Sequence, residues 1–264
     1  MHYEGILTKM QTEQGNPIQY YIVFENSFLS VNQLLGKDLE INFMGFSCLN
    51  CTKKKKIWRM GYCYDCFYSI PSAGDWIMRP ELSTAHMGIA DRDLDYETKS
   101  QVQPHIVYLA AASDVKVGVT RKTQVPTRWI DQGATQAIPV IEVPNRYLAG
   151  ITEVALKNHM SDKINWKKML CNDISPIDLI SQRAFVRPLL PDEVQEYFDT
   201  TEEKLYSLTY PVLEYPKKIN SLNLVITPVF QGKLTGIKGQ YLIFEDGTVF
   251  NVRAYEGHAV QINI

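Results

Sequence analysis

The stretch that decides the fold is HIVYLAAASDVKVGVTRKTQVPTRWIDQGATQAIPVIEVPNRYLAGITEVALKNHM, residues 105–160. It opens with an apolar, β-branched run over residues 106–110, which is typical of a buried strand. Residues 115–120 alternate apolar and polar side chains, as a half-buried strand does. The stretch therefore predicts two neighbouring strands joined by a tight turn.

Two helices and a third strand are expected in the rest of this stretch. Pro126 suits the first turn of a short helix, and Gly133 stands where that helix would end. Residues 138–143 are again apolar and β-branched, which predicts the third strand. A longer helix is expected over residues 146–160, with Glu153 on it.

These residues resemble the GIY-YIG nuclease superfamily. Tyr108, in the sequence Ile-Val-Tyr, matches the tyrosine of the first motif, and Lys116-Val117-Gly118 stands at the second motif. Most members have tyrosine where this chain has Lys116. Arg128 matches the helix arginine, and Glu153 matches the metal-binding glutamate. The resemblance implies that Tyr108 acts at the attacking water, that Arg128 contacts the phosphoryl oxygens and that Glu153 holds Mg²⁺ or Mn²⁺. Lys116 is expected to contact a phosphate.

Each residue also has a purely structural interpretation. Tyr108 could pack inside its strand, and Glu153 could be a solvated helix position. Arg128 could pair with Asp131, three residues further along the same helix face.

A wider resemblance covers nearly the whole chain. The motifs GYCYDCF, KVGVTR, RWIDQGA and GIKGQYLIF are similar to those of an uncharacterised bacterial family called domain of unknown function 2797. That resemblance implies an architecture but no activity.

Composition sets the broad class of protein. The 264 residues carry a formal net charge of −2. No apolar run approaches the length of a membrane span, and the first residues lack the apolar core of a signal peptide, so we expect a cytoplasmic protein without membrane contact. Residues 45–170 hold 17 Lys and Arg against 12 Asp and Glu. This mildly basic centre permits contact with nucleic acid without requiring it.

Four of the five cysteines form two Cys-x-x-Cys pairs, which are Cys48 with Cys51 and Cys63 with Cys66. Each pair places two thiolates on one tight knuckle, and two knuckles complete a tetrahedral zinc site. Because four thiolates leave no open position, the expected zinc is structural. The lysines at 53–56 lie between the knuckles, where they are either a solvated loop or a phosphate contact.

The two ends of the chain resemble each other. Gly232-Lys-Leu-Thr echoes Gly5-Ile-Leu-Thr, and residues 257–264 echo residues 36–43 at a constant offset of 221. A repeated three-stranded unit is too small to be stable alone, so the two units are expected to form one β-barrel or sandwich.

The expected fold is α+β, in four parts. They are an N-terminal β half-unit (1–44), a zinc ribbon with an irregular connector (45–104), a GIY-YIG-like core with a helical extension (105–210), and a C-terminal β half-unit (211–264). The helices of the extension are expected over residues 166–170, 176–185 and 191–208.

Two functions are compatible with the sequence. The first is a metal-dependent phosphodiesterase that acts on DNA or RNA, which would make the chain an endonuclease. The second is a zinc-containing nucleic-acid-binding or scaffold protein without turnover. Catalysis requires Tyr108, Arg128 and Glu153 to meet in one open cleft. Binding without turnover requires only that basic and aromatic side chains are exposed on the surface.

Overall fold

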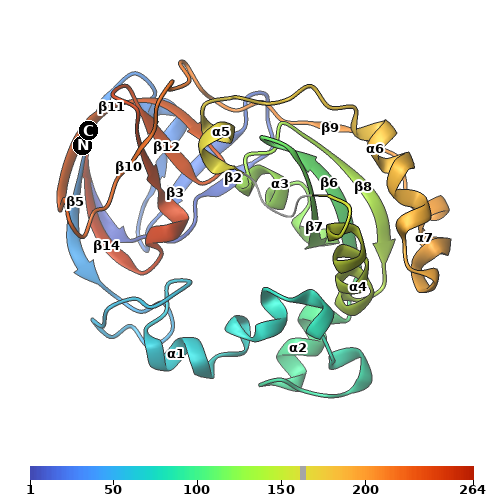
Figure 1. The fold of residues 1–264 in the computed structure, drawn as a ribbon. Coiled ribbons are helices and arrows are strands. Elements are labelled where there is room, and N and C mark those ends of the chain that lie inside the picture. The colour runs from blue at the N-terminus through green and yellow to red at the C-terminus, as the bar shows by residue number, and fades with distance from the viewer. Residues whose placement is uncertain (161–164) are drawn as a thin grey trace.

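The chain folds into a β-rich lobe built from its two ends, an α/β core, and a cysteine-bearing connector below the gap between them (Figure 1). The computed structural model describes residues 1–160 and 165–264. In this part of the chain the strands form sheets of seven, three and four strands, in the orders β1-β14-β5-β11-β12-β13-β10, β2-β3-β4 and β7-β6-β8-β9. The fold is therefore α+β, as the sequence predicts.

The strands are β1 (His2–Ile6), β2 (Gln11–Glu13), β3 (Gln19–Val23), β4 (Phe28–Ser30), β5 (Asp38–Phe46), β6 (His105–Ala111), β7 (Val115–Arg121), β8 (Gln136–Val143), β9 (Tyr206–Ser207), β10 (Asn220–Ser221), β11 (Val229–Lys238), β12 (Tyr241–Phe244), β13 (Thr248–Asn251) and β14 (His258–Asn263). The α-helices are α1 (Tyr64–Ser69), α2 (Leu94–Gln101), α3 (Thr127–Asp131), α4 (Arg146–Lys157), α5 (Trp166–Leu170), α6 (Leu179–Val186) and α7 (Gln195–Thr200).

Strands from both chain ends share the largest sheet. β1 pairs with β14, and β5 lies between β14 and β11. The termini consequently lie side by side (Figure 1), and Met1 and Ile264 exchange backbone hydrogen bonds of 2.8 and 3.0 Å. The described strands do not close into a barrel, because β1 and β10 each have a neighbour on one side only. Of the two expected arrangements, a barrel or a sandwich, the barrel is therefore wrong.

The two chain ends are joined by two equivalent hydrogen bonds. In each, a glycine before the last strand of one end donates to a residue after or within a strand of the other end. The Gly257 N–H donates to Leu7 O at 2.9 Å, and the Gly36 N–H donates to Leu234 O at 2.7 Å. Gly36 and Gly257 both have φ of +79°. A left-handed backbone at these positions favours glycine, which explains why glycine stands at both ends of the 221-residue offset. β1 of the N-terminal end thus pairs with β14, and β11 of the C-terminal end pairs with β5.

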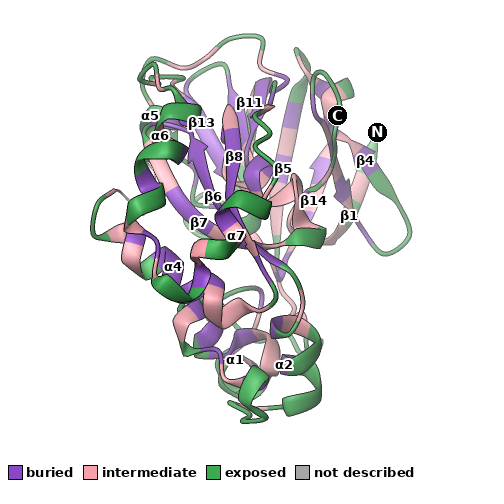
Figure 2. Cartoon of the chain, turned by 90° about the vertical axis from the view of Figure 1, so that its right-hand side faces the viewer, coloured by how far each residue is buried: buried purple, intermediate pink, exposed green. Residues whose placement is uncertain are grey.

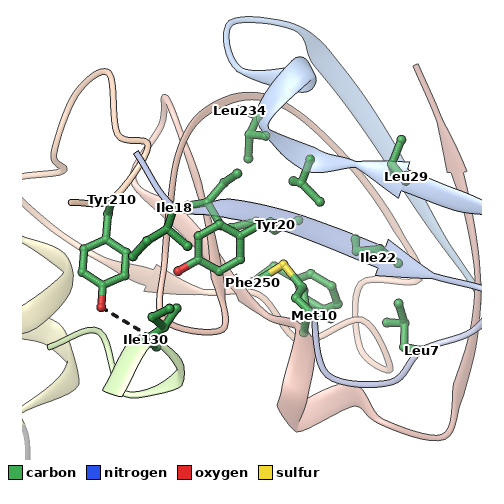
Figure 3. Close-up of a cluster of buried hydrophobic side chains, with 14 of the residues drawn as sticks. Leu7, Met10, Ile18, Tyr20, Ile22, Leu29, Ile130, Tyr210, Leu234 and Phe250 are labelled. Carbon is green, nitrogen blue, oxygen red and sulfur yellow. Dashed lines mark hydrogen bonds between the residues drawn. The ribbon is translucent and has the colours of Figure 1, made fainter. Parts of the chain in front are cut away.

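A large apolar core fills the β lobe and reaches the α/β core. Figure 3 shows Tyr20, Ile22 and Phe250 in this cluster, with Ile130 of α3 at its border. Tyr210 spans the junction, because its hydroxyl donates to the carbonyl of Ala134 at 2.7 Å. The lobe and the core therefore share buried side chains.

β6 is the central strand of the four-stranded sheet, and every residue on it is buried. Side chains of a strand alternate between its faces. Tyr108 and Ala110 accordingly join the core shared with the β lobe, whereas Val107 and Leu109 join a second core under the outer helices. Figure 2 shows β6 and β8 largely buried, whereas helices α5 and α6 each carry both buried and exposed residues.

Several predicted elements are confirmed, and two predictions are wrong. The helix expected over 166–170 is α5, but the helix expected over 191–208 ends at Thr200, and β9 follows it. The connector contains α1 and α2 rather than only irregular chain. The buried helix residue Glu97 accepts backbone hydrogen bonds from three preceding residues at 2.7 to 3.0 Å. A helix held by a buried carboxylate lacks the apolar periodicity that predicts helices from sequence.

Candidate functional site

A cleft of about 570 Å³ lies where the α/β core, the connector and the β lobe meet. Tyr108, Lys116, Arg128 and Glu153 all line it, although they come from β6, β7, α3 and α4. Seven cationic side chains and two carboxylates from the described residues line the cleft. The cations are Lys9, Lys116, Arg121, Arg128, Arg146, Lys157 and Arg253, and the carboxylates are Asp131 and Glu153. Such a lining attracts an anionic ligand.

Tyr108 projects from β6 towards this cleft across Gly118 of the neighbouring strand. A Cβ on Gly118 would lie 2.6 Å from the Tyr108 hydroxyl oxygen, so the glycine makes room for the phenol. The hydroxyl donates a hydrogen bond of 3.0 Å to Oε1 of Gln132. Burial raises the pKa of Tyr108, against the opposing effect of Arg128. The phenol is therefore neutral near neutral pH.

Arg128 stands on α3, one helical turn before Gln132, and interacts with the Tyr108 phenol. Asp131, the alternative partner considered from the sequence, has other contacts. Its carboxylate accepts hydrogen bonds of 2.8 Å from Lys9 Nζ and 2.8 Å from Gln240 Nε2. Asp131 therefore joins the core to the β lobe.

Glu153 lies on α4, with 11% of its side chain exposed, and forms an ion pair of 3.4 Å with Lys157. Burial raises the pKa of Glu153, while the charges of Lys157, Lys116 and Arg146 act to lower it. The carboxylate is thus surrounded by cations on the cleft wall.

A short 3-10 turn, Pro80–Leu82, packs directly against α4 beside the cleft. A Cβ on Gly150 of α4 would overlap the backbone of Pro80 and Glu81, so glycine permits this close approach. Asn145 caps the start of this helix, because its side chain accepts the Leu148 N–H at 2.9 Å.

Sequence reasoning missed the contributions of Arg146 and Gln132. Arg146 donates to the backbone oxygens of Trp76 at 3.1 Å and Ile77 at 2.9 Å, and its guanidinium lies 5.4 Å from the Trp76 ring centre. Burial lowers the pKa of Arg146 to about 10. The one sequence signal for a role of Arg146 is its position in the first turn of a predicted helix. Gln132 carries no such signal, because a single amide side chain near the end of a helix is common.

The four paired cysteines lie together in the connector. Their Sγ atoms are all within 4.8 Å of one another. Burial disfavours the Cys48 thiolate, but backbone N–H donors including that of Cys63 outweigh it and lower the pKa of Cys48 to about 6. Asn50 Nδ2 donates to Cys66 Sγ at 3.3 Å and favours its thiolate, but burial and the three neighbouring cysteines outweigh this donor and raise the pKa of Cys66 to about 11. N–H donors directed at sulfur favour thiolates, which are the metal-binding form of cysteine. This cluster can therefore hold a metal ion such as zinc.

The lysines at 53–56 are exposed beside this cluster. Lys55 forms an ion pair of 2.6 Å with Asp65 of α1. The run is thus a solvated loop in this structure, and a phosphate contact stays a prediction.

Comparison with known proteins places the chain in a family. A family model described as "Protein of unknown function (DUF2797)" matches residues 36–260. The chain belongs to this family. The matched region includes the cysteine cluster and the four predicted cleft residues. No curated protein and no solved structure matches the chain. Among the described residues, none of the helices combines the length and apolar character that crossing a membrane requires.

Proposed function

We propose that the cleft is the active site of a metal-dependent phosphodiesterase that cleaves DNA or RNA, in the manner of the GIY-YIG nucleases. The observation that supports this most strongly is the convergence of Tyr108, Arg128 and Glu153 on one basic cleft. Hydrolysis of a phosphodiester needs an oriented water, a cation for the developing charge and donors on the phosphoryl oxygens. The cleft offers side chains for each of these tasks.

The two carboxylates of the cleft differ in availability. Asp131 is committed to Lys9 and Gln240, which leaves Glu153 as the ligand for Mg²⁺ or Mn²⁺. One carboxylate is enough for Mg²⁺, because this ion keeps several waters and takes substrate oxygens as further ligands. When bound, the ion would supply Lewis acidity at the phosphoryl group.

Arg128 would act on the phosphoryl group, and Tyr108 would act on the attacking water. A guanidinium donates two parallel hydrogen bonds to a phosphoryl group, so Arg128 would neutralise charge that grows towards the transition state. The Tyr108 hydroxyl already donates to Gln132, which leaves its oxygen to accept a hydrogen bond from the attacking water. Its raised pKa favours orienting the water over deprotonating it. Lys116 would hold a neighbouring phosphate as a point charge.

The second candidate function is a nucleic-acid-binding protein without turnover. It is favoured by the ion pair that already engages Glu153 with Lys157. Within the described residues, the four cysteines are also the one group of three or more metal-ligating side chains close enough to share an ion. A catalytic ion would therefore depend on the substrate for much of its coordination.

The four cysteines are proposed to hold a structural zinc ion. Four thiolates fill a tetrahedral shell with Zn–S distances of about 2.3 Å and leave no position for substrate. This site would fix α1 against the hairpin that precedes it.

The test is cleavage of labelled single-stranded, duplex and branched DNA and RNA with Mg²⁺ or Mn²⁺. Wild type is expected to cut at least one substrate, and Glu153→Gln is expected to bind that substrate without cutting it. Glu142→Gln is the matched control, because Glu142 is paired with Lys122 outside the cleft. Binding by wild type without cleavage of any substrate would support the second function instead.

A further inference from the structure

Three neighbouring aromatic rings are exposed around α1 of the cysteine-bearing connector. Trp58, Tyr64 and Tyr68 are 50%, 58% and 55% exposed, and we call them the aromatic patch. Rings of this size are usually buried, so an exposed group of them marks an interaction surface.

The aromatic patch lies on the segments that carry the cysteines. Tyr64 and Tyr68 lie one turn apart on α1, so they share one helix face. Trp58 comes from the hairpin before α1, whose strands meet at Arg59 and Tyr62. The Tyr64 ring centre is 5.5 Å from that of Trp58 and 4.8 Å from that of Tyr68. The three rings form one continuous group.

Positive charge surrounds the patch. Residues 53–68 contain five lysines and arginines and one aspartate, a formal charge of +4. A zinc ion with four thiolates contributes −2, which leaves the unit positive. The Arg59 guanidinium lies 5.9 Å from the Trp58 ring centre. Surfaces that bind single-stranded nucleic acids combine exposed aromatic rings with cationic side chains. The rings stack on the bases, and the cations contact the phosphates.

The chain next to the aromatic patch reaches the cleft. Met60, two residues after Trp58, lines the cleft, and so does Ser72, which follows α1. We propose that the aromatic patch stacks the unpaired bases of a single-stranded nucleic acid whose backbone continues into the cleft. This inference rests on the proposed function, whose substrate it specifies as one with a single-stranded segment beside the cleavage point.

The test uses the emission of Trp58, which is the exposed one of the four tryptophans, since Trp76 and Trp129 are buried and Trp166 is half-buried. Glu153→Gln protein is titrated with oligothymidylate of about 12 nucleotides, a length within the range that such surfaces cover. Stacking on Trp58 is expected to quench emission. Trp58→Phe is expected to bind as tightly but to lose most of the quenching.

Loss of a ring is expected to weaken binding. Trp58→Ala and Tyr68→Ala should each raise the Kd for oligothymidylate about fivefold or more, because a stacked base contributes this much at the lower limit. Tyr68→Phe keeps the ring and should keep the affinity. Phe185→Ala removes a ring that is 57% exposed on α6, on the opposite side of the molecule (Figure 1), and should change nothing. Oligouridylate should behave as oligothymidylate does, since stacking does not involve the 2′-hydroxyl.

The proposal is overturned if the alanine variants keep their zinc and bind oligothymidylate as wild type does. It is also overturned if they lose affinity for a blunt duplex to the same extent, because a blunt duplex offers no unpaired bases. These results can be distinguished from a failure of the proposed nuclease function. If wild type cuts no substrate, the nuclease fails while the titration still decides the patch. If Trp58→Ala cuts a flanked and an unflanked duplex at equal rates while wild type prefers the flanked one, both proposals are supported.

Discussion

Gly118→Ala tests whether the glycine of the Lys-Val-Gly motif is there to seat the Tyr108 phenol. The added Cβ would lie 2.6 Å from the Tyr108 oxygen and 2.7 Å from Cζ, so the oxygen would have to move by about 0.8 Å to reach an ordinary contact of 3.4 Å. The ring cannot move easily, because it is fully buried and packs edge-on against Trp129 at 5.8 Å.

The expected cost follows from three contributions. Overpacking of a buried ring costs about 1–3 kcal/mol. Loss of the hydrogen bond to Gln132 costs about 0.5–1.5 kcal/mol. Replacing glycine by alanine also reduces the conformational freedom of the unfolded chain, which stabilises the folded protein by about 0.4–1 kcal/mol. The net loss is about 2 kcal/mol, which lowers the Tm of a chain of this size by about 4–8 °C.

The assay is thermal or urea unfolding of a double-mutant cycle with Tyr108→Ala. In the Tyr108→Ala background the contact is gone, so Gly118→Ala should be neutral or slightly stabilising. Equal losses of stability in both backgrounds would refute the reasoning. Tyr108→Phe isolates the hydroxyl and should cost only the hydrogen bond.

Three further predictions concern parts of the molecule outside the cleft chemistry. Asp131→Ala removes the hydrogen bonds from Lys9 and Gln240 and should lower the free energy of unfolding by about 1–3 kcal/mol, measured by urea unfolding; an unchanged value would show that these two hydrogen bonds do not stabilise the junction between the β lobe and the α/β core. Lys238 is buried, which lowers its pKa from 10.5 to about 8, so the unfolded chain binds more protons between these values and stability should rise as pH increases through that window. Lys238→Met should therefore remove this rise, measured by urea unfolding at pH 7 and at pH 10; a variant that keeps the same rise would contradict the sign. Cys63→Ser should abolish stoichiometric zinc in metal analysis, and retention of one ion per chain would place zinc elsewhere.

The sequence predicts the local elements of the core well, because its apolar periodicity is regular. The run around Tyr108 is β6, and the helix after Pro126 is α3 with Gly133 in a left-handed conformation just past its end. The cysteine spacing likewise predicts the cluster, since two knuckles of this kind can meet around one ion.

What the sequence does not predict are the long-range polar contacts. The link from Asp131 to Gln240 spans 109 residues, and the anchoring of Arg146 on Trp76 spans 70. No local pattern signals either contact, because each depends on how separate elements pack. The repeat at the chain ends is visible in the sequence. The pairing of β1 with β14 and of β11 with β5 is not, because no sequence pattern marks which strands pair with each other.

The central claim is that Arg128 and Glu153 carry phosphodiester cleavage in the cleft. The most direct measurement is single-turnover cleavage by wild type, Arg128→Ala and Glu153→Gln, with the Kd of the same substrate measured in parallel. Arg187→Ala, which removes an exposed arginine paired with Asp199, controls for loss of general charge. We predict that Arg128→Ala lowers the cleavage rate by about 10²–10³-fold, with a smaller change in Kd, and that Glu153→Gln removes metal-dependent cleavage. Cleavage that survives both substitutions at the wild-type rate would contradict the account.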